Sequence, residues 1–489
     1  MPYVSLGEFL AELQDNGELL RISAQVDSAL ELAAIVERVS KEAKNGGSAL
    51  LFENVKNSSI PVVANLLGNE RRLCRSLGVA SLDEVSAILE RSSETERSGG
   101  WWDPFKSSSD TTGLGRWAPK TVKTAACQQV VRLGRDLDLW TLPVPRCWPD
   151  ETHPVITSGL LVTSHPATGK NVSYRSPLAV TNQQELAWYI DNADQKEIVC
   201  RAIESKQNLP VAISLGGDPM LAFSTIFPGS VDSRSLIGLL RGKSLELVRC
   251  RTNELEVPAG AELVIEGYID AANSWSADEI SIARGNGRYV RGRLPLIQVT
   301  AVTHRANPVF PAMIPALPPS EETWLGLAAE RLLLPLVRRL LPEIVDIHQP
   351  ISSASRNILF VSIQKTADHQ ARRVLHALWG MESIGQSKII VVVNHVVNVR
   401  CEEQVWLTVG THACPSRDFV FSDGLARDDD YTPLTATLAS RVGIDATRKQ
   451  HHETNQPWPE SLKISNEIAS RISERWAEYG INERMKAES

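Results

Sequence analysis

The chain has 489 residues, of which 43% are hydrophobic and 22% charged, and its formal net charge is −7. This length exceeds what a single hydrophobic core supports, so we expect two or three domains. Acids and bases are interspersed, which argues against nucleic acid as a partner because a nucleic-acid-binding protein concentrates its basic residues on one face.

The N-terminal segment and the cysteines indicate the cellular setting. The segment is amphipathic and acidic, unlike a signal peptide, and no stretch reaches the roughly 20 apolar residues that span a bilayer. We therefore expect a cytoplasmic protein with no transmembrane segment. The seven cysteines include no Cys-x-x-Cys pair, so we expect reduced thiols rather than disulfides or a thiolate zinc site.

Residues 5–18 are predicted to form a helix, because Ser5 and Glu8 have the spacing of a capping box and apolar residues follow at helical period. A second helix is predicted to open at residues 28–31, and the apolar runs 49–52 and 60–67 are predicted strands. Alternating helices and strands predict an N-terminal α/β domain over residues 1–115. The polar stretch 91–112 is typical of a linker or a long surface loop.

The pattern changes over residues 116–310, where short β-branched runs outnumber helices. These runs predict a β-rich central domain of the barrel type. The predicted strands cover residues 156–163, 211–215, 245–250, 262–269 and 295–303.

A long apolar helix is predicted over residues 320–341, within a connecting segment that we assign to residues 311–345. Pro335 should kink this helix or end its first part. The remaining residues, 346–489, are predicted to form a C-terminal α/β domain. Its predicted elements are strands over 357–363 and 388–393 and helices over 371–380 and 461–478.

Several short segments, in order and at family-like separations, resemble the UbiD family of prenylated-FMN-dependent decarboxylases. They are Leu-Gly-Gly-Asp-Pro at 215–219, Leu-Leu-Arg-Gly at 239–242, Leu-Glu-Val-Pro-Ala at 255–259, Glu-Gly-Tyr at 266–268, Leu-Pro-Glu-Ile-Val-Asp at 341–346 and Gly-Ile-Asp-Ala-Thr at 443–447. Each segment is weak alone, but their ordered combination is specific and covers about residues 5–450.

The resemblance implies a multidomain α/β fold. It comprises an N-terminal α/β domain, a central flavin-reductase-like split β-barrel, a long connecting helix and a C-terminal α/β oligomerisation domain. It also implies a carboxy-lyase that decarboxylates aromatic or α,β-unsaturated acids, as 3-polyprenyl-4-hydroxybenzoate decarboxylase does. Such enzymes use prenylated FMN, supplied by a flavin prenyltransferase, with Mn or Mg and often K beside its phosphate. Loss of CO2 from an sp² carbon needs the cofactor, because no side chain can accept the resulting charge.

The segment Asn-Val-Ser-Tyr-Arg at 171–175 resembles the family's Asn-Val/Leu-Gly-Ile/Met-Tyr-Arg segment, shortened by one residue. The resemblance makes Arg175 the catalytic arginine beside the substrate carboxylate, and a planar, permanently charged guanidinium suits this role. A salt bridge at the end of a strand is the alternative interpretation. Ser173, Tyr174, Arg175 and Trp188 are the implied cofactor-binding residues.

The resemblance also implies two metal ligands, the Glu256 carboxylate and the Asn171 carbonyl. Oxygen donors of this kind suit a hard Mn or Mg ion. For Glu256, an ordinary salt bridge at a strand end is an equally good interpretation. Asp191 and Asp194 lie where the family has basic residues, and they would repel a phosphate unless a cation intervenes. Solvated surface acids are the simpler interpretation of these two.

The family's acid-x-x-x-x-acid stretch corresponds to residues 279–284. Glu279 keeps the first acid and is the second implied catalytic residue, whereas Arg284 replaces the acid that donates the proton. Arginine stays protonated at neutral pH and cannot shuttle protons. An ion pair between Arg284 and Glu279 would make Glu279 a poorer acid as well.

Three functions therefore stay open. The first is a UbiD-like carboxy-lyase that acts on a small carboxylic acid as a homo-oligomer. The second is a catalytically impaired UbiD-like subunit, which would serve as the structural or regulatory partner of an active homologue in a hetero-oligomer. The third, a flavin-binding protein with another redox role, rests on the predicted barrel alone.

Overall fold

The computed structural model describes most of the chain. The described residues are 3, 5–43, 45–94, 113–226, 233–272, 274–353, 357–381, 387–425, 432, 435, 438–454, 458, 459, 462 and 464–479. The chain divides into two compact units, one of residues 1–365 with 371–447 and one of residues 366–370 with 448–489. Every site residue predicted from the sequence lies in the larger unit.

The N-terminal sheet has four strands in the order β1-β2-β3-β18. Its strands and helices are α1 (Leu6–Asp15), β1 (Leu19–Val26), α2 (Glu31–Glu42), β2 (Ala49–Val55), β3 (Val62–Ala64) and β18 (Phe310–Ala312). Ser5 caps α1 by accepting a hydrogen bond from the Glu8 amide, which confirms the predicted helix start. The strand β1 was not predicted, and β18 joins from a segment more than 200 residues away, beside β3.

Two helices, α3 (Glu70–Leu77) and α4 (Leu82–Glu94), follow this sheet. Asn69 caps α3, and Gly78 ends it in the left-handed conformation that favours glycine. Residues 91–94 of the predicted linker belong to α4, while the rest of it up to residue 112 lies outside the described residues.

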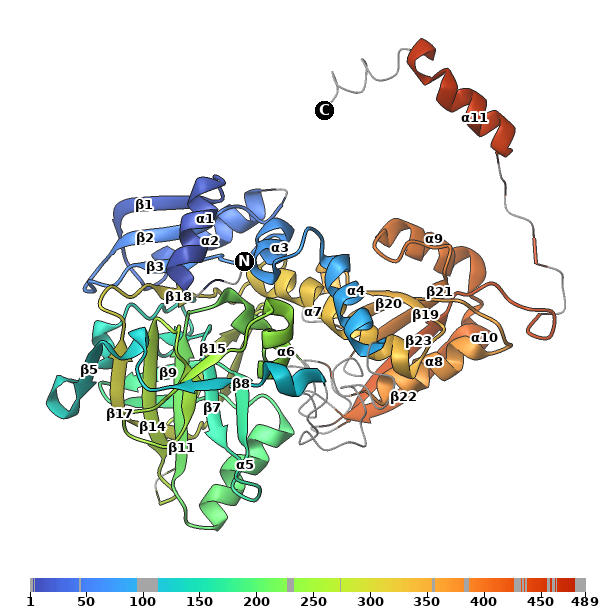
Figure 1. Cartoon of the computed structure of the whole chain (residues 1–489). Coiled ribbons are helices and arrows are strands. Elements are labelled where there is room, and N and C mark those ends of the chain that lie inside the picture. Colours follow the sequence, from blue (N-terminus) through green and yellow to red (C-terminus); the bar gives the residue numbers. More distant parts are fainter. Residues whose placement is uncertain are drawn as a thin grey trace. The chain divides into compact units, whose positions relative to one another are not determined.

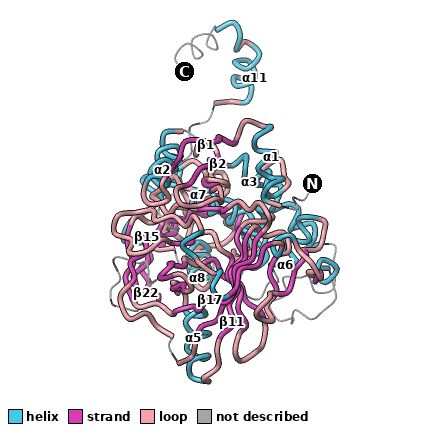
Figure 2. The backbone as a smooth tube through the Cα atoms, turned by 90° about the vertical axis from the view of Figure 1, so that its left-hand side faces the viewer, coloured by secondary structure: helices cyan, strands magenta, loops and turns pink. Residues whose placement is uncertain are grey.

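The central sheet has nine strands, in the order β6-β9-β10-β17-β14-β11-β7-β8 with β5 also paired to β17. They are β5 (Val130–Leu133), β6 (Val155–Ile156), β7 (Leu160–Ser164), β8 (Asn171–Arg175), β9 (Leu178–Asn182), β10 (Glu185–Trp188), β11 (Leu209–Leu215), β14 (Leu263–Ile269) and β17 (Leu296–His304). Figure 2 shows this sheet as a curved layer of strands. The predicted β-rich middle segment is thus confirmed as a curled, half-barrel sheet.

Smaller elements cover the outer face of this sheet in two places. They are η1 (Gly113–Trp117), β4 (Lys120–Val122), η5 (Pro219–Phe223), α6 (Ser233–Arg241), β12 (Glu246–Arg249), β13 (Glu256–Pro258), β15 (Ile280–Arg284) and β16 (Arg288–Gly292). The helix α5 (Ala193–Glu204) packs against the inner face instead. The sheet β13-β12-β4 packs on the end that carries β7, β11 and β14. The hairpin β15-β16 packs on the end that carries β6, β9 and β10. Two of the predicted site residues, Ser173 and Glu256, lie at the first cover, and Arg284 lies on the second.

The connecting helix α7 (Glu321–Leu340) continues through Pro335, so the alternative that the helix ends at this proline is wrong. A proline lacks the amide hydrogen that would bond the carbonyl four residues earlier, here that of Arg331. The Ser86 hydroxyl of α4 donates a hydrogen bond to that carbonyl. Figure 1 shows α4 lying along α7. This packing explains how Ser86, which is distant in the sequence, can supply the hydrogen bond that the Arg331 carbonyl lacks.

The C-terminal sheet has five strands in the order β19-β20-β21-β23-β22. Its elements are β19 (Ile344–His348), β20 (Ile358–Ile363), α8 (Gln370–Trp379), β21 (Ile389–Asn394), α9 (Glu402–His412), α10 (Pro415–Asp418), β22 (Phe419–Leu425) and β23 (Leu438–Asp445). The three inner strands are parallel and both edge strands antiparallel, and the strands and helix predicted over residues 357–393 are confirmed.

The smaller unit contains α11 (Asn466–Glu474), which is shorter than the predicted helix at 461–478. All seven cysteines are free thiols, as predicted. Across the described residues, no helix is both long enough and apolar enough to cross a membrane. The four-part division of the chain stays a prediction.

Candidate active site

Strand β8 carries four of the predicted site residues and directs them to two faces of the sheet. Side chains alternate along a strand, so Asn171, Ser173 and Arg175 share one face while Tyr174 points to the other. Ser173 pairs with Val162 of β7, and Arg175 pairs with Leu160. The short Asn-Val-Ser-Tyr-Arg segment therefore places its polar residues on the outer face.

The inner face of the sheet holds Tyr174 and Trp188. Trp188, at the end of β10, has none of its surface exposed and belongs to the core of the curled sheet. The rings of Tyr174 and Trp188 lie 6.1 Å apart with an interplanar angle of 39°. Within the described residues the buried Trp188 Nε1 has no hydrogen-bond partner. An orphaned buried donor is unusual and is compatible with a bound polar group on this side.

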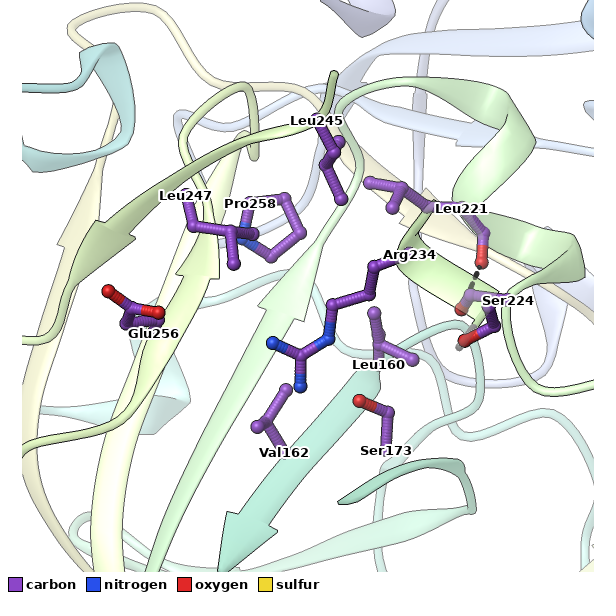
Figure 3. Close-up of a pocket in the computed structure, with 11 residues that line it drawn as sticks. Leu160, Val162, Ser173, Leu221, Ser224, Arg234, Leu245, Leu247, Glu256 and Pro258 are labelled. Carbon is purple, nitrogen blue, oxygen red and sulfur yellow. Dashed lines mark hydrogen bonds between the residues drawn. The ribbon is translucent and has the colours of Figure 1, made fainter. Parts of the chain in front are cut away.

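A pocket lies on the outer face, between the sheet, α6 and β12-β13. Figure 3 shows its lining, in which the Arg234 side chain extends from α6 into the pocket between Glu256 and Ser173. The lining residues are Leu160, Val162, Ser173, Leu221, Ser224, Ser233, Arg234, Leu245, Leu247, Glu256 and Pro258. The structure thus brings two predicted residues, Ser173 and Glu256, to one pocket and adds Arg234, which sequence analysis missed.

Two polar contacts hold the pocket walls. Asp218, just before η5, forms a buried ion pair with Arg241 at the end of α6. Burial raises the pKa of Asp218, and the Arg241 guanidinium opposes that rise. Glu256 accepts a 2.7 Å hydrogen bond from the Thr121 hydroxyl of β4. These contacts fix α6 and Glu256 relative to the pocket.

The second predicted acid–arginine pair lies on the hairpin β15-β16. Arg284 forms an ion pair with Asp191, with 3.6 Å between Nη2 and Oδ2, and its guanidinium lies over the Tyr189 ring at 4.9 Å. Glu279 is exposed at the start of β15. Residues five apart on a strand point to opposite faces, so the geometry opposes the ion pair between Arg284 and Glu279 that the sequence suggested. Asp194 is exposed on α5, whereas Asp191 is half-buried beside Arg284.

The hairpin is held in place by Glu151, which sequence analysis did not identify. Its buried carboxylate accepts hydrogen bonds from the amides of Cys147, Trp148 and Ala283, at 2.7, 3.1 and 3.1 Å. Burial raises the pKa of Glu151, although the three amides favour its ionised form. This carboxylate ties the strand that carries Arg284 to the loop before β6.

The start of α7 supplies two acids that were also missed. Glu321 is buried and accepts a 2.8 Å hydrogen bond from the Leu67 amide, while its Oε2 has no partner among the described residues. Burial raises the pKa of Glu321, and the charges of Arg72 and Arg175 oppose that rise. The carboxylate of the neighbouring Glu322 lies against the backbone of the residue after Arg284. Both arginines highlighted by the sequence therefore border this helix end.

The donors around the pocket do not fit the divalent metal that the sequence suggested. In the described part of the chain, no three His, Cys, Asp or Glu side chains group as metal ligands would. Asn171 is exposed on β8, and the Arg234 guanidinium extends toward the space beside Glu256. A fixed positive charge there repels a divalent cation. The residues fit an anionic or polar group better.

Three family models match the chain, all described as 3-octaprenyl-4-hydroxybenzoate carboxy-lyase domains. The N-terminal domain model matches residues 10–92, the Rift-related domain model residues 120–318 and the C-terminal domain model residues 323–446. Together they follow the order of the segments on which the sequence resemblance rested.

Solved structures give the same result. An evolved dimeric form of the UbiD-class enzyme HmfF from Pelotomaculum thermopropionicum, in complex with prFMN, is 26% identical with a TM-score of 0.76, covering 94% of this chain and 97% of that one. Vanillic acid decarboxylase from Sedimentibacter hydroxybenzoicus, in closed form, shares the fold at 22% identity with a TM-score of 0.82, covering 99% and 100%. Klebsiella pneumoniae 3,4-dihydroxybenzoic acid decarboxylase shares the fold at 18% identity with a TM-score of 0.74, covering 94% and 98%.

Proposed function

The chain belongs to the UbiD family of carboxy-lyases, and from this premise we propose that it decarboxylates an aromatic or α,β-unsaturated carboxylic acid. The proposed reaction is non-oxidative and resembles that of 3-polyprenyl-4-hydroxybenzoate decarboxylase. The family's members are decarboxylases, and the similar HmfF was solved in complex with prFMN. The observation that carries the proposal for this chain is the placement of Arg175 on the same face of β8 as the pocket-lining Ser173.

Arg175 is the proposed partner of the substrate carboxylate. Its planar guanidinium can form two parallel hydrogen bonds to a carboxylate, which orients the C–C bond that breaks. The nearby Leu160 and Val162 exclude water from this side, which strengthens the interaction. We keep Glu279 as the predicted second catalytic residue, although its exposure at the strand start means that a substrate would have to cover it.

Prenylated FMN is the proposed cofactor, and when bound it supplies the electron sink that the carbanion needs. Ser173 and Arg175 would contact it from the outer face of β8. Tyr174 and Trp188, the other two predicted cofactor-binding residues, lie on the inner face of the sheet, so they would not contact a cofactor bound on the outer face. A flavin prenyltransferase would have to supply the cofactor in the cell.

The carbon that loses CO2 must gain a proton, and residue 284 cannot give one because arginine does not deprotonate. Glu321 is the acid that best suits this role in the described residues. Its pKa is raised by burial, so the carboxyl keeps a proton more readily, and it lies within electrostatic reach of Arg175. The competing interpretation is structural, because Glu321 also bonds the Leu67 amide.

A second candidate function is the catalytically impaired subunit that pairs with an active homologue. The observation in its favour is the ion pair of Arg284 with Asp191, because the family resemblance assigns residue 284 to the position of the proton donor. In that case the C-terminal sheet would form the contact with the active subunit. In the first case the same surface would form a homo-oligomer.

Both functions can be tested with protein made together with a flavin prenyltransferase. The enzyme hypothesis predicts coloured protein, release of prenylated FMN by mass spectrometry, and CO2 release from at least one acid in a panel of aromatic and cinnamic-type acids. Arg175→Lys should keep the cofactor and lose turnover, whereas Arg201→Lys, at an exposed position of α5, should keep both. Colourless protein, or full activity in Arg175→Lys, would contradict the proposal.

A further inference from the structure

The pocket on the outer face of β7 and β8 contains a cation that belongs to the chain itself. Arg234 is the second residue of α6, and its guanidinium extends over Val162 to a position between Glu256 and Ser173 (Figure 3). Arg234 and Ser233, the first two residues of the helix, both line the pocket. The positive end of the helix dipole therefore faces the same space as the guanidinium.

These features favour an anion as the ligand. The guanidinium and the hydroxyls of Ser173 and Ser233 are hydrogen-bond donors suited to phosphate oxygens. The Ser224 hydroxyl is different, because it donates its hydrogen to the Leu221 carbonyl at 2.7 Å and can only accept from a ligand. The surrounding Leu160, Val162 and Leu247 are apolar, which strengthens a contact between opposite charges.

Glu256 is the acid among the lining residues, and it distinguishes two ways of binding a phosphate. If a divalent metal bridged the chain and the phosphate, Glu256 would be needed as its ligand. If Arg234 binds the phosphate directly, Glu256 repels the phosphate and is dispensable. Its hydrogen bond from Thr121 gives it a structural partner that requires no metal.

We propose that Arg234 takes the place of the divalent metal in this protein and binds the phosphate monoester of a flavin mononucleotide directly. The proposal rests on the proposed function for the identity of the flavin. It predicts that the protein prefers FMN over riboflavin, which has the same ring but no phosphate. It also predicts that this preference needs Arg234 and needs neither a metal nor Glu256.

The test is equilibrium titration of the apoprotein with FMN and with riboflavin, followed by quenching of flavin fluorescence, with and without EDTA. The wild type should prefer FMN, and EDTA should leave that preference unchanged. Arg234→Gln should lower the affinity for FMN roughly 10- to 100-fold, the range for losing a charge-assisted hydrogen bond to phosphate, and leave riboflavin binding unchanged. Arg234→Lys should retain part of the preference.

Two controls accompany these variants. Arg201→Gln removes an exposed guanidinium from α5, away from the residues that line the pocket, and should leave both flavins unaffected. Glu256→Gln should bind FMN as tightly as the wild type or more tightly. Loss of the FMN preference in EDTA or in Glu256→Gln would establish a metal site and overturn the proposal, as would an unchanged preference in Arg234→Gln.

Failure of the proposed function is recognised separately. If neither flavin binds, the proposal of a flavin cofactor is refuted. The anion site is then tested separately, by measuring whether inorganic phosphate raises the thermal midpoint of the protein. A rise in the wild type and in Arg201→Gln that is absent in Arg234→Gln supports an anion site at Arg234. An equal rise in all three proteins, or none in any of them, overturns it.

Discussion

Removing the guanidinium of Arg331 should strongly destabilise the chain. Arg331 lies in α7 with 3% of its side chain exposed, and it pairs with Glu330 at 3.2 Å and with Asp346 of β19. It also donates a hydrogen bond to the carbonyl of Ile347. Arg331→Met keeps most of the aliphatic stem and removes the charge, so the change isolates the ionic contacts.

The expected cost is about 3–5 kcal/mol, the usual penalty for breaking a buried ion pair by removing one partner. Glu330 would stay buried with its charge uncompensated on that side. Arg400→Met is the matched control, because Arg400 pairs with Asp83 and Asp346 but is 43% exposed. Exposed pairs contribute only about 0–1 kcal/mol, since water and salt screen them.

Urea unfolding midpoints and hydrogen exchange of the β19 and β20 amides measure the difference, and exchange avoids assuming two-state unfolding in a protein of this size. Arg331→Met should lower both clearly more than Arg400→Met. Adding Glu330→Gln to Arg331→Met should recover part of the loss, because it removes the stranded charge. Equal effects of the two arginine variants, or no recovery in the double variant, would refute the reasoning.

Further predictions concern other sites. Arg284→Glu would place a carboxylate beside Asp191, and the repulsion between the two carboxylates favours a protonated acid there. In cofactor-loaded protein the decarboxylation rate should therefore rise by about 10²–10⁴-fold. An unchanged rate would mean that residue 284 is not the missing proton donor. Burial raises the pKa of Glu321. The protonated carboxyl therefore stabilises the folded protein at low pH, and this stabilisation is lost as the pH rises through the raised pKa. Glu321→Gln should therefore gain thermal midpoint relative to the wild type between about pH 4.5 and 8, and a constant difference would contradict this sign. The pKa of the Cys414 thiol is lowered by its contact with Ser416, so in native protein Cys414→Ser should remove the fastest reaction with iodoacetamide; an unchanged fast phase would place the reactive thiol elsewhere. Phe421 is 73% exposed on the edge strand β22, so Phe421→Lys should lower the mass measured by light scattering if that edge joins subunits, and an unaltered mass would rule out this edge.

Local patterns were sufficient to predict some of the helices and strands, although fewer than half of them. The capping-box spacing of Ser5 and Glu8 located the start of α1, because a cap depends only on neighbouring residues. The order of the family segments indicated the family, which the domain models support.

Contacts between distant segments could not be predicted in this way. The residues near Pro335 do not predict that Ser86 will donate a hydrogen bond to the Arg331 carbonyl, because α4 and α7 meet only after folding. Arg284 likewise pairs with Asp191, which lies more than 90 residues away, rather than with the acid five residues earlier, just before its strand.

The sequence by itself therefore determined some of the elements, the family and the two arginines Arg175 and Arg284, because these depend on local spacing and on ordered segments. Only the tertiary structure decided what surrounds them. Folding brought Arg234 of α6 to Ser173 of β8 and placed Glu321 near Arg175, since curling the sheet and packing helices on it join segments that no local pattern relates. The charge of a pocket is the sum of contributions from residues that are distant in the sequence, so only the tertiary structure determines it.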